Sequence, residues 1–198
     1  IEELRHGEAD LGSAASSHYA RCLCSMPHLR SLMLNRVKLS DEFYSTMASE
    51  ASNTKIEELR HGEADLGSAA SSHYARCLCS MPHLRSLDLS HMKLNDEFYS
   101  TMASEASNTK IEELRHGEAD LGSAASSHYA RCLCSMPHLR SLKLDSVKLS
   151  DEFYSTMASE ASKSKIQMLS MKDVSMMTPR RLHSILSLPR LQSLTMKD

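Results

Sequence analysis

The residues with the clearest metal-binding chemistry are a histidine and two cysteines in the pattern His18-x-x-x-Cys22-x-Cys24. The pattern recurs as His73, Cys77 and Cys79 and again as His128, Cys132 and Cys134. Imidazole and thiolate groups are the usual ligands of zinc, and a structural zinc site needs four of them. On a helix His18 and Cys22 share a face, but Cys24 points away and a fourth ligand is missing. We therefore predict no metal ion or other cofactor, and interpret Cys24 as a small core residue.

The spacing of the six cysteines also disfavours disulfides. Equivalent cysteines lie two strands apart in the stacked fold derived below, a separation of about 10 Å. A disulfide needs Cα atoms within about 7 Å. Free thiols are typical of a reducing compartment, and the chain starts without the basic and apolar stretch of a signal peptide. We therefore expect a cytoplasmic protein.

Three histidines, His6, His61 and His116, stand where the repeat pattern described below requires leucine. A buried neutral imidazole needs a partner for its N–H group. The simpler interpretation is a core histidine with satisfied hydrogen bonds, or a locally wet strand end. The alternative is a pH-sensitive column, which predicts a loss of stability towards acid pH.

Serine and histidine are plentiful, but they recur at fixed repeat positions, as structural residues do. The sequence contains no phosphate-binding loop, nucleophile elbow or paired-carboxylate site. We predict that the chain is not an enzyme.

Internal repetition organises the chain. Residues 1–55 recur almost letter for letter as residues 56–110 and 111–165, and a diverged partial copy occupies residues 166–198. Fifty-five residues form a small core on their own, so stacked units that share one core are expected. The chain starts without Met and in the middle of the pattern, so we interpret it as a fragment of a longer protein.

Each unit contains two shorter repeats. The apolar residues Leu29, Leu32, Leu34, Val37 and Leu39 have the spacing of a leucine-rich repeat. The other half has the same spacing with two substitutions: Ile56, Leu59, His61, Ala64 and Leu66. Strands are therefore expected to begin near residues 1, 29, 56, 84, 111, 139, 166 and 191.

Between the strands the apolar period lengthens towards that of a helix. Phe43, Met47 and Ala51 recur at four-residue spacing, and Ser40 or Asp41 can cap the helix that they predict. In the other half, Tyr19, Leu23 and Met26 form the inward stripe, and Pro27 ends the helix. The prediction is an α/β solenoid curved into a horseshoe, with parallel strands on the concave face and helices on the convex face.

The first and second units differ at five positions only. The pairs are Met33/Asp88, Asn35/Ser90, Arg36/His91, Val37/Met92 and Ser40/Asn95. The third unit has Lys143, Asp145, Ser146, Val147 and Ser150 there, and otherwise departs only at Lys163 and Ser164. No buried position accepts Met, Asp and Lys in turn, so the position of Met33 must be exposed to water. Because Leu32 and Leu34 point inwards, side-chain alternation places residues 31, 33 and 35 on the concave face.

Two interpretations of this variation compete. Recent duplications drift wherever drift is harmless, but the helix surfaces are equally exposed and are identical between the units. We favour the second interpretation, that the concave face has been diversified to recognise a ligand. The predicted ligand-binding residues are Met33, Asn35, Arg36, Asp88, Ser90, His91, Lys143, Asp145 and Ser146. The unvaried charges, Glu3, Arg5 and Glu8 and their copies, are expected to serve solubility and cross-strand pairing, although a contact role stays open.

Composition limits the partners. The formal net charge of −2 argues against a dedicated nucleic-acid binder, and no apolar run is long enough to span a membrane. Solenoids need polar caps, and neither Ile1 nor Leu194 and Met196 has one. We therefore expect end-to-end self-association of the uncapped termini, or marginal solubility.

The segment from Cys22 to Leu32, with Leu-Cys followed by proline and then the strand, resembles ribonuclease-inhibitor-type leucine-rich repeats. Without cysteine-rich caps, the chain is similar to the C-terminal repeats of NOD-like innate immune receptors. That resemblance implies sensing of a protein or pathogen-derived ligand, and autoinhibition of a nucleotide-binding module outside this chain. The alternatives are an inhibitor scaffold like ribonuclease inhibitor, an engineered repeat array, or an enzyme whose catalytic part lies elsewhere. An inhibitor of a basic enzyme should be strongly acidic, and a designer would remove most Cys and Met residues.

Overall fold

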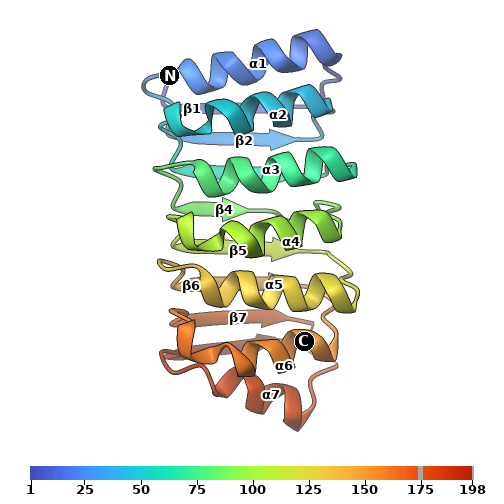
Figure 1. Ribbon diagram of the computed structural model, residues 1–198, viewed down its shortest axis with the longest axis vertical. Helices are drawn as coiled ribbons and strands as arrows, with labels where there is room; N and C mark the ends of the chain where they lie inside the picture. The colour runs from blue at the N-terminus through green and yellow to red at the C-terminus, as the bar shows by residue number, and fades with distance from the viewer. Residues whose placement is uncertain (174–175, 198) are drawn as a thin grey trace.

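The computed structural model describes residues 1–173 and 176–197. Within them, strands and helices alternate along the chain, and eight strands form one parallel sheet in sequential order (Figure 1). The strands are β1 Glu3–Gly7, β2 Ser31–Asn35, β3 Glu58–Gly62, β4 Ser86–Asp88, β5 Glu113–Gly117, β6 Ser141–Asp145, β7 Met168–Lys172 and β8 Ser193–Lys197. The helices are α1 Ser13–Ser25, α2 Asp41–Glu50, α3 Ser68–Ser80, α4 Asp96–Glu105, α5 Ser123–Ser135, α6 Asp151–Ser159 and α7 Pro179–Leu186. Short 3-10 helices follow three of them: η1 Ala51–Asn53, η2 Ala106–Asn108 and η3 Ala161–Lys163.

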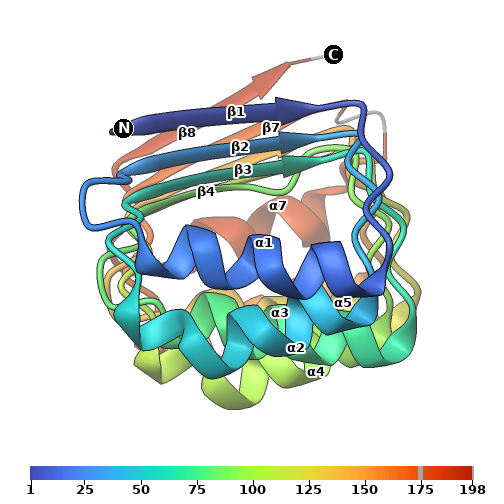
Figure 2. The same ribbon diagram turned by 90° about the horizontal axis from the view of Figure 1, so that it is seen from above.

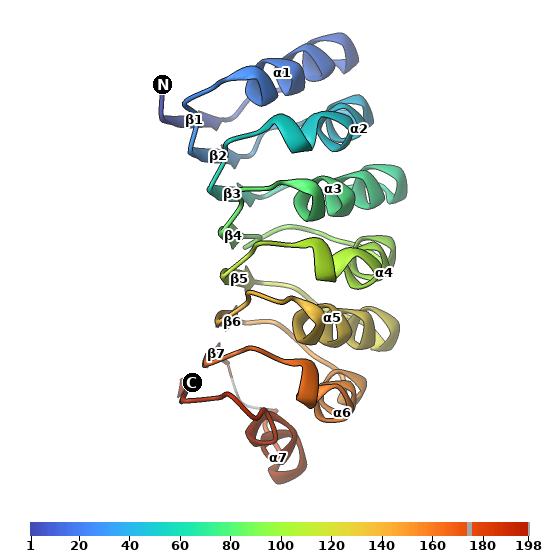
Figure 3. The same cartoon turned by 60° about the vertical axis from the view of Figure 1, so that its left-hand side comes forward.

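The molecule has two layers. The helices cover one face of the open sheet, and the other face is left uncovered (Figure 2). The helices fan out more widely than the strands, so the stack curves with the sheet on its inner side (Figure 3). The chain is thus an α/β leucine-rich repeat solenoid, as the sequence predicts, and we call the uncovered side of the sheet the concave face.

Each strand begins two residues later than predicted. The first apolar residue of each repeat lies in the turn before the strand: Leu29 and Ile56, for example, are fully buried there. The carbonyl of Arg30 accepts bonds from the amides of both Glu57 and Glu58, at 2.7 and 2.9 Å. This shared acceptor belongs to a turn, and the regular ladder starts after it.

Side-chain alternation along the strands builds the core as predicted. Leu32 faces Leu4 and Leu59 in the parallel register, and the same column of leucines continues through the sheet. Leu32, Leu87 and Leu142 are each 1% exposed. Burying one leucine side chain stabilises the fold by about 1.5–3 kcal/mol, so each column contributes over the whole length of the stack.

The apolar position that follows the variable strands, at Val37, Met92 and Val147, is only partly as predicted. Val37 and Met92 are buried, but Val147 is partly exposed and lines a surface hollow beside Met176 and Met177. Position 37 is therefore fully enclosed in the first two units alone.

The variation at position 40 has a structural explanation. Ser40 occupies the N-cap of α2 without a side-chain cap bond, whereas the Asn95 side chain accepts a hydrogen bond from the Phe98 amide at the start of α4. A side-chain N-cap bond satisfies an amide that the helix itself leaves free. The residue at position 40 therefore affects the capping of a helix N-terminus and is not part of the ligand surface.

Five of the six cysteines are buried in the core, Cys22 is exposed, and all six are free thiols. Cys24, Cys79 and Cys134 each donate a weak hydrogen bond to a methionine sulfur, the first to Met47 at 3.4 Å. Burial raises the pKa of Cys24 to about 11. Among residues 1–173 and 176–197, no three His, Cys, Asp or Glu side chains converge as a metal site would require.

The simpler interpretation of the inward histidines, a core histidine with satisfied hydrogen bonds or a wet strand end, is wrong for His61. His61 and His116 are 1% and 0% exposed, and neither ring nitrogen of His61 has a hydrogen-bond partner. The His61 ring packs at 6.1 Å from Tyr44 and edge-on at 5.3 Å from Tyr74. Only His6, half-buried in the first repeat, pairs well, with the Tyr19 hydroxyl at 3.0 Å. The His116 Nε2 atom lies 3.4 Å from the Tyr99 hydroxyl. Aromatic packing alone therefore holds the His61 imidazole, whereas packing and one hydrogen bond hold that of His116.

Within the described part of the chain, no helix combines the length and apolar character needed to cross a bilayer.

Candidate ligand-binding face

The strand register aligns the third residue of every strand in one row across the concave face. We call this the central row: Arg5, Met33, Arg60, Asp88, Arg115, Lys143, Ser170 and Thr195. Met33 and Asp88 are partly exposed and Lys143 is fully exposed, although each follows a buried leucine. The alternation thus leaves all three variable side chains in water, as expected.

A hollow of about 300 Å³ lies at the middle of this face. Four of the predicted ligand-binding residues line it, namely Asn35, Asp88, Ser90 and His91, together with Arg60 and Arg115. Lys143 lies outside it but lines an adjoining hollow of about 120 Å³, again with Arg60, Asp88 and Arg115. The structure therefore brings together residues from five consecutive strands, β2 to β6, and the corner that follows β4.

Two glycines let this hollow form. A Cβ atom on Gly62 would lie 3.2 Å from the Ser90 carbonyl oxygen, and one on Gly117 would lie 3.2 Å from the Asp145 carbonyl oxygen. The Ser90 Oγ atom is equally close, at 3.3 Å from the Gly117 position. The backbones of neighbouring repeats approach so closely that a side chain at either glycine would displace the variable residues.

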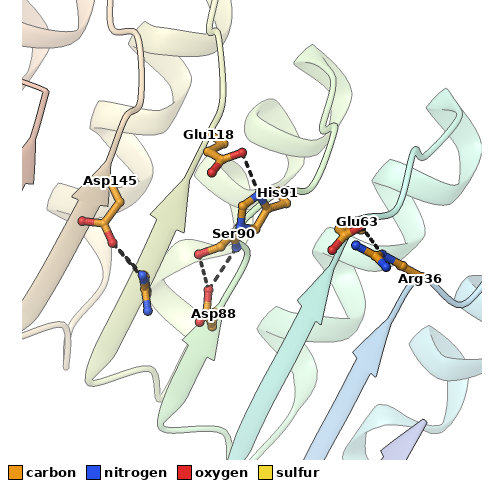
Figure 4. Close-up of polar contacts among 8 residues, drawn as sticks. Arg36, Glu63, Asp88, Ser90, His91, Glu118 and Asp145 are labelled. Carbon is orange, nitrogen blue, oxygen red and sulfur yellow. Dashed lines mark hydrogen bonds and ion pairs between the residues drawn. The ribbon is translucent and has the colours of Figure 1, made fainter. Parts of the chain in front are cut away.

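Asp88 and Ser90 change the backbone as well as the surface. The Asp88 carboxylate accepts hydrogen bonds from the Ser90 amide at 3.0 Å and the Ser90 hydroxyl at 2.6 Å (Figure 4). This local bond competes with the strand ladder, so β4 ends at Asp88 while β2 and β6 continue for two more residues. The second unit therefore presents a bent corner where the other two present a strand.

In the corner that follows each of the strands β1 to β7, one residue adopts a left-handed backbone conformation. The corner row consists of Glu8, Arg36, Glu63, His91, Glu118, Ser146 and Asp173, with φ between 52° and 63°. Arg36 forms an ion pair with Glu63, and the His91 Nδ1 atom lies 2.7 Å from the Glu118 carboxylate (Figure 4). The bond to Arg36 lowers the pKa of Glu63.

These corner contacts change the status of two predicted ligand residues. Arg36 and His91 are exposed, but both are engaged by the unvaried glutamates of the neighbouring repeats. Ser146 occupies the same corner position in the third unit. Asp145 is also engaged: it pairs with Arg115 at 2.8 Å and with Lys172 at 3.4 Å, and its side chain is 17% exposed. Asp88 and Lys143 are therefore more available to a ligand than Arg36, His91 or Asp145.

Arg60 and Arg115 were not among the predicted ligand-binding residues, because neither varies between the units. The register places Asp88 directly between them, and both line the two hollows. The Arg60 side chain is exposed and makes no ion pair or hydrogen bond with the residues that the structure describes. The only signal available beforehand was the repeat alignment, which puts an arginine beside the variable position on either side.

No model of a known protein family matches this chain, and no curated protein matches it. Among solved structures, the chain is similar to one titled "Crystal structure of TLR13-ssRNA13 complex", with 18% sequence identity and a TM-score of 0.45. The match covers 76% of this chain and 23% of the other. The chain thus spans less than a quarter of the length of that neighbour.

Proposed function

We propose that this chain is a recognition module that binds a protein ligand through the central row of its concave face and catalyses no reaction. The observation that carries the proposal is the distribution of differences between the three units. Their helices are identical up to Ser159 at the end of α6, whereas the central row changes from Met33 to Asp88 to Lys143. A scaffold that repeats nearly all of its buried and convex residues but varies the residues of one exposed face has the design of a recognition surface.

In its finer form, the proposal assigns the module to an intracellular innate immune receptor that senses a protein or pathogen-derived ligand. The support is the resemblance of the Cys22–Leu32 segment to ribonuclease-inhibitor-type repeats, and of the repeats without cysteine-rich caps to the C-terminal repeats of NOD-like receptors. The six free cysteines fit a reducing compartment.

Photo-crosslinking tests the proposal. A photoreactive amino acid placed at Lys143 on the concave face is compared with one at Arg131, an exposed position on the convex helix α5. In a lysate of the producing cells, we expect adducts from position 143 that disappear when Asp88→Lys is introduced, and none that depend on Asp88 from position 131. Equal adducts from both positions, or adducts insensitive to Asp88→Lys, would refute a concave recognition surface.

A further inference from the structure

We propose that the occupant of the central row is an α-helix of a partner protein, lying along the stack across the strands. This inference rests on the proposed function, because it names the shape and charge pattern of the ligand at the same site. The helix would carry an apolar residue opposite Met33, acidic residues opposite Arg60, Arg115 and Lys143, and a basic residue opposite Asp88.

The spacing of the central row favours a helix over an extended chain. Neighbouring parallel strands lie about 4.8 Å apart, so successive members of the row repeat at that interval. A helix rises about 1.5 Å per residue, and side chains three or four residues apart share one face, at intervals of about 4.5–6 Å. Side chains on one face of an extended strand repeat at about 6.8 Å, and therefore fall out of step with the row after two members.

The matching positions follow from these intervals. If residue i of the partner helix faces Arg60, residue i+3 faces Asp88, i+7 faces Arg115 and i+10 faces Lys143. These residues rise about 4.5, 10.5 and 15 Å along the helix, against about 4.8, 9.6 and 14.4 Å along the row. Residue i−4 then faces Met33, the apolar member that the register places beside Arg60.

The charges along the row are available to such a ligand. Arg60 has all five N–H donors free of the described residues. Arg115 uses its Nε and one terminal nitrogen on Asp145, at 3.0 and 2.8 Å, which leaves further donors for a second carboxylate. Among the described residues, the Asp88 carboxylate is hydrogen-bonded only to nearby Ser90. A ligand with uniform charge would meet repulsion at one of these members, so the alternation itself selects the partner.

The flanking rows disfavour a simple polyanion. Glu58 and Glu113 precede the central row on β3 and β5, and the corner row adds Glu63 and Glu118 on the other side. A nucleic acid or other polyanion would place phosphates against these carboxylates. A helix that contacts the central row along one face avoids both flanks, because its charged positions are confined to that face.

Synthetic helices of about 16 residues, stapled to hold the helical form, test the inference by fluorescence anisotropy with the full chain. The matched peptide carries Leu, Glu, Lys, Glu and Glu at positions i−4, i, i+3, i+7 and i+10. The comparison peptides have the same composition in scrambled order, or the same order with a proline that prevents the helix. We expect binding by the matched peptide alone, weakened by salt.

Charge exchange identifies the contact. Arg60→Glu should weaken binding of the matched peptide about tenfold, because a like-charged pair replaces an attractive one. A peptide with Lys at position i should regain binding to Arg60→Glu. The control Arg76→Glu makes the same charge change on the exposed side of α3, and should leave binding unchanged.

Two results would overturn the inference: equal binding of matched and scrambled peptides, or no response to Arg60→Glu with no rescue by the exchanged peptide. If the crosslinked adducts at Lys143 still depend on Asp88 while the peptides fail, the helical ligand is refuted and the recognition surface stands. Loss of both refutes the proposed function as well.

Discussion

Burial of His61 and His116 predicts that mild acid destabilises this protein. Both imidazoles are enclosed by tyrosines, Tyr44 and Tyr74 around His61 and Tyr99 and Tyr129 around His116. Desolvation lowers the pKa of each histidine from 6.5 to about 4. In His116 the nearby Asp88 carboxylate opposes part of this effect, because it favours the imidazolium.

The sign follows from proton linkage. The unfolded chain binds protons to these histidines below about pH 6.5, whereas the folded chain binds them only near pH 4, so stability is lost as the pH falls through this window. At pH 5 the cost is about 2 kcal/mol for each histidine, or about 4 kcal/mol for both, relative to pH 7.5. Carboxylates with lowered pKa values, such as Glu63, lose their contribution mainly below about pH 4.5, which separates the two effects.

Urea unfolding followed by circular dichroism at pH 7.5 and pH 5.0 measures the loss. In the register, His61 faces Leu34 and His116 faces Leu144, so leucine fits the same column. The double variant His61→Leu, His116→Leu should lose most of the pH dependence. The control His138→Gln alters an exposed histidine and should keep it. Equal stability of the unmodified protein at the two pH values would show that the imidazoles are not buried.

Three further predictions concern the core and the corners. Of the six thiols only Cys22 is exposed, and burial raises the pKa of Cys79 and Cys134 to about 12. Ellman's reagent at pH 7.5 should therefore label one thiol quickly. A thiol that still reacts quickly in the Cys22→Ser variant would contradict this. Gly117→Ala should destabilise the fold by about 1–3 kcal/mol, because the added Cβ would press on Asp145 and Ser90. Thermal melts compare it with Gly12→Ala, whose added Cβ meets no described atom within 4 Å beyond its chain neighbours. Equal melting temperatures of the two variants would refute the close approach at Gly117. Asn95→Ala should cost about 1 kcal/mol through loss of the α4 cap; an unchanged urea midpoint would show that the cap bond contributes nothing.

The repeat pattern was sufficient to predict the fold and the exposure of the variable row. An apolar residue at every second position forces a strand with one buried face, so the location of Met33, Asp88 and Lys143 followed from Leu32, Leu87 and Leu142. The helix positions followed from the four-residue spacing of Phe43 and Met47, because side chains four residues apart lie on one face of a helix. These are local consequences of side-chain periodicity, and the same periodicity recurs in each repeat.

Only the tertiary structure decided what happens between repeats. The cross-strand register places Asp88 between Arg60 and Arg115, and residues 27 or 28 positions apart in the sequence become neighbours through that pairing. The same neighbour relations engage Arg36 and His91 with glutamates, leave His61 without a hydrogen-bond partner, and turn the Asp88 side chain onto Ser90. Periodicity fixes which way a side chain points, but the atoms it meets there belong to another repeat, and their geometry exists only once the stack has formed.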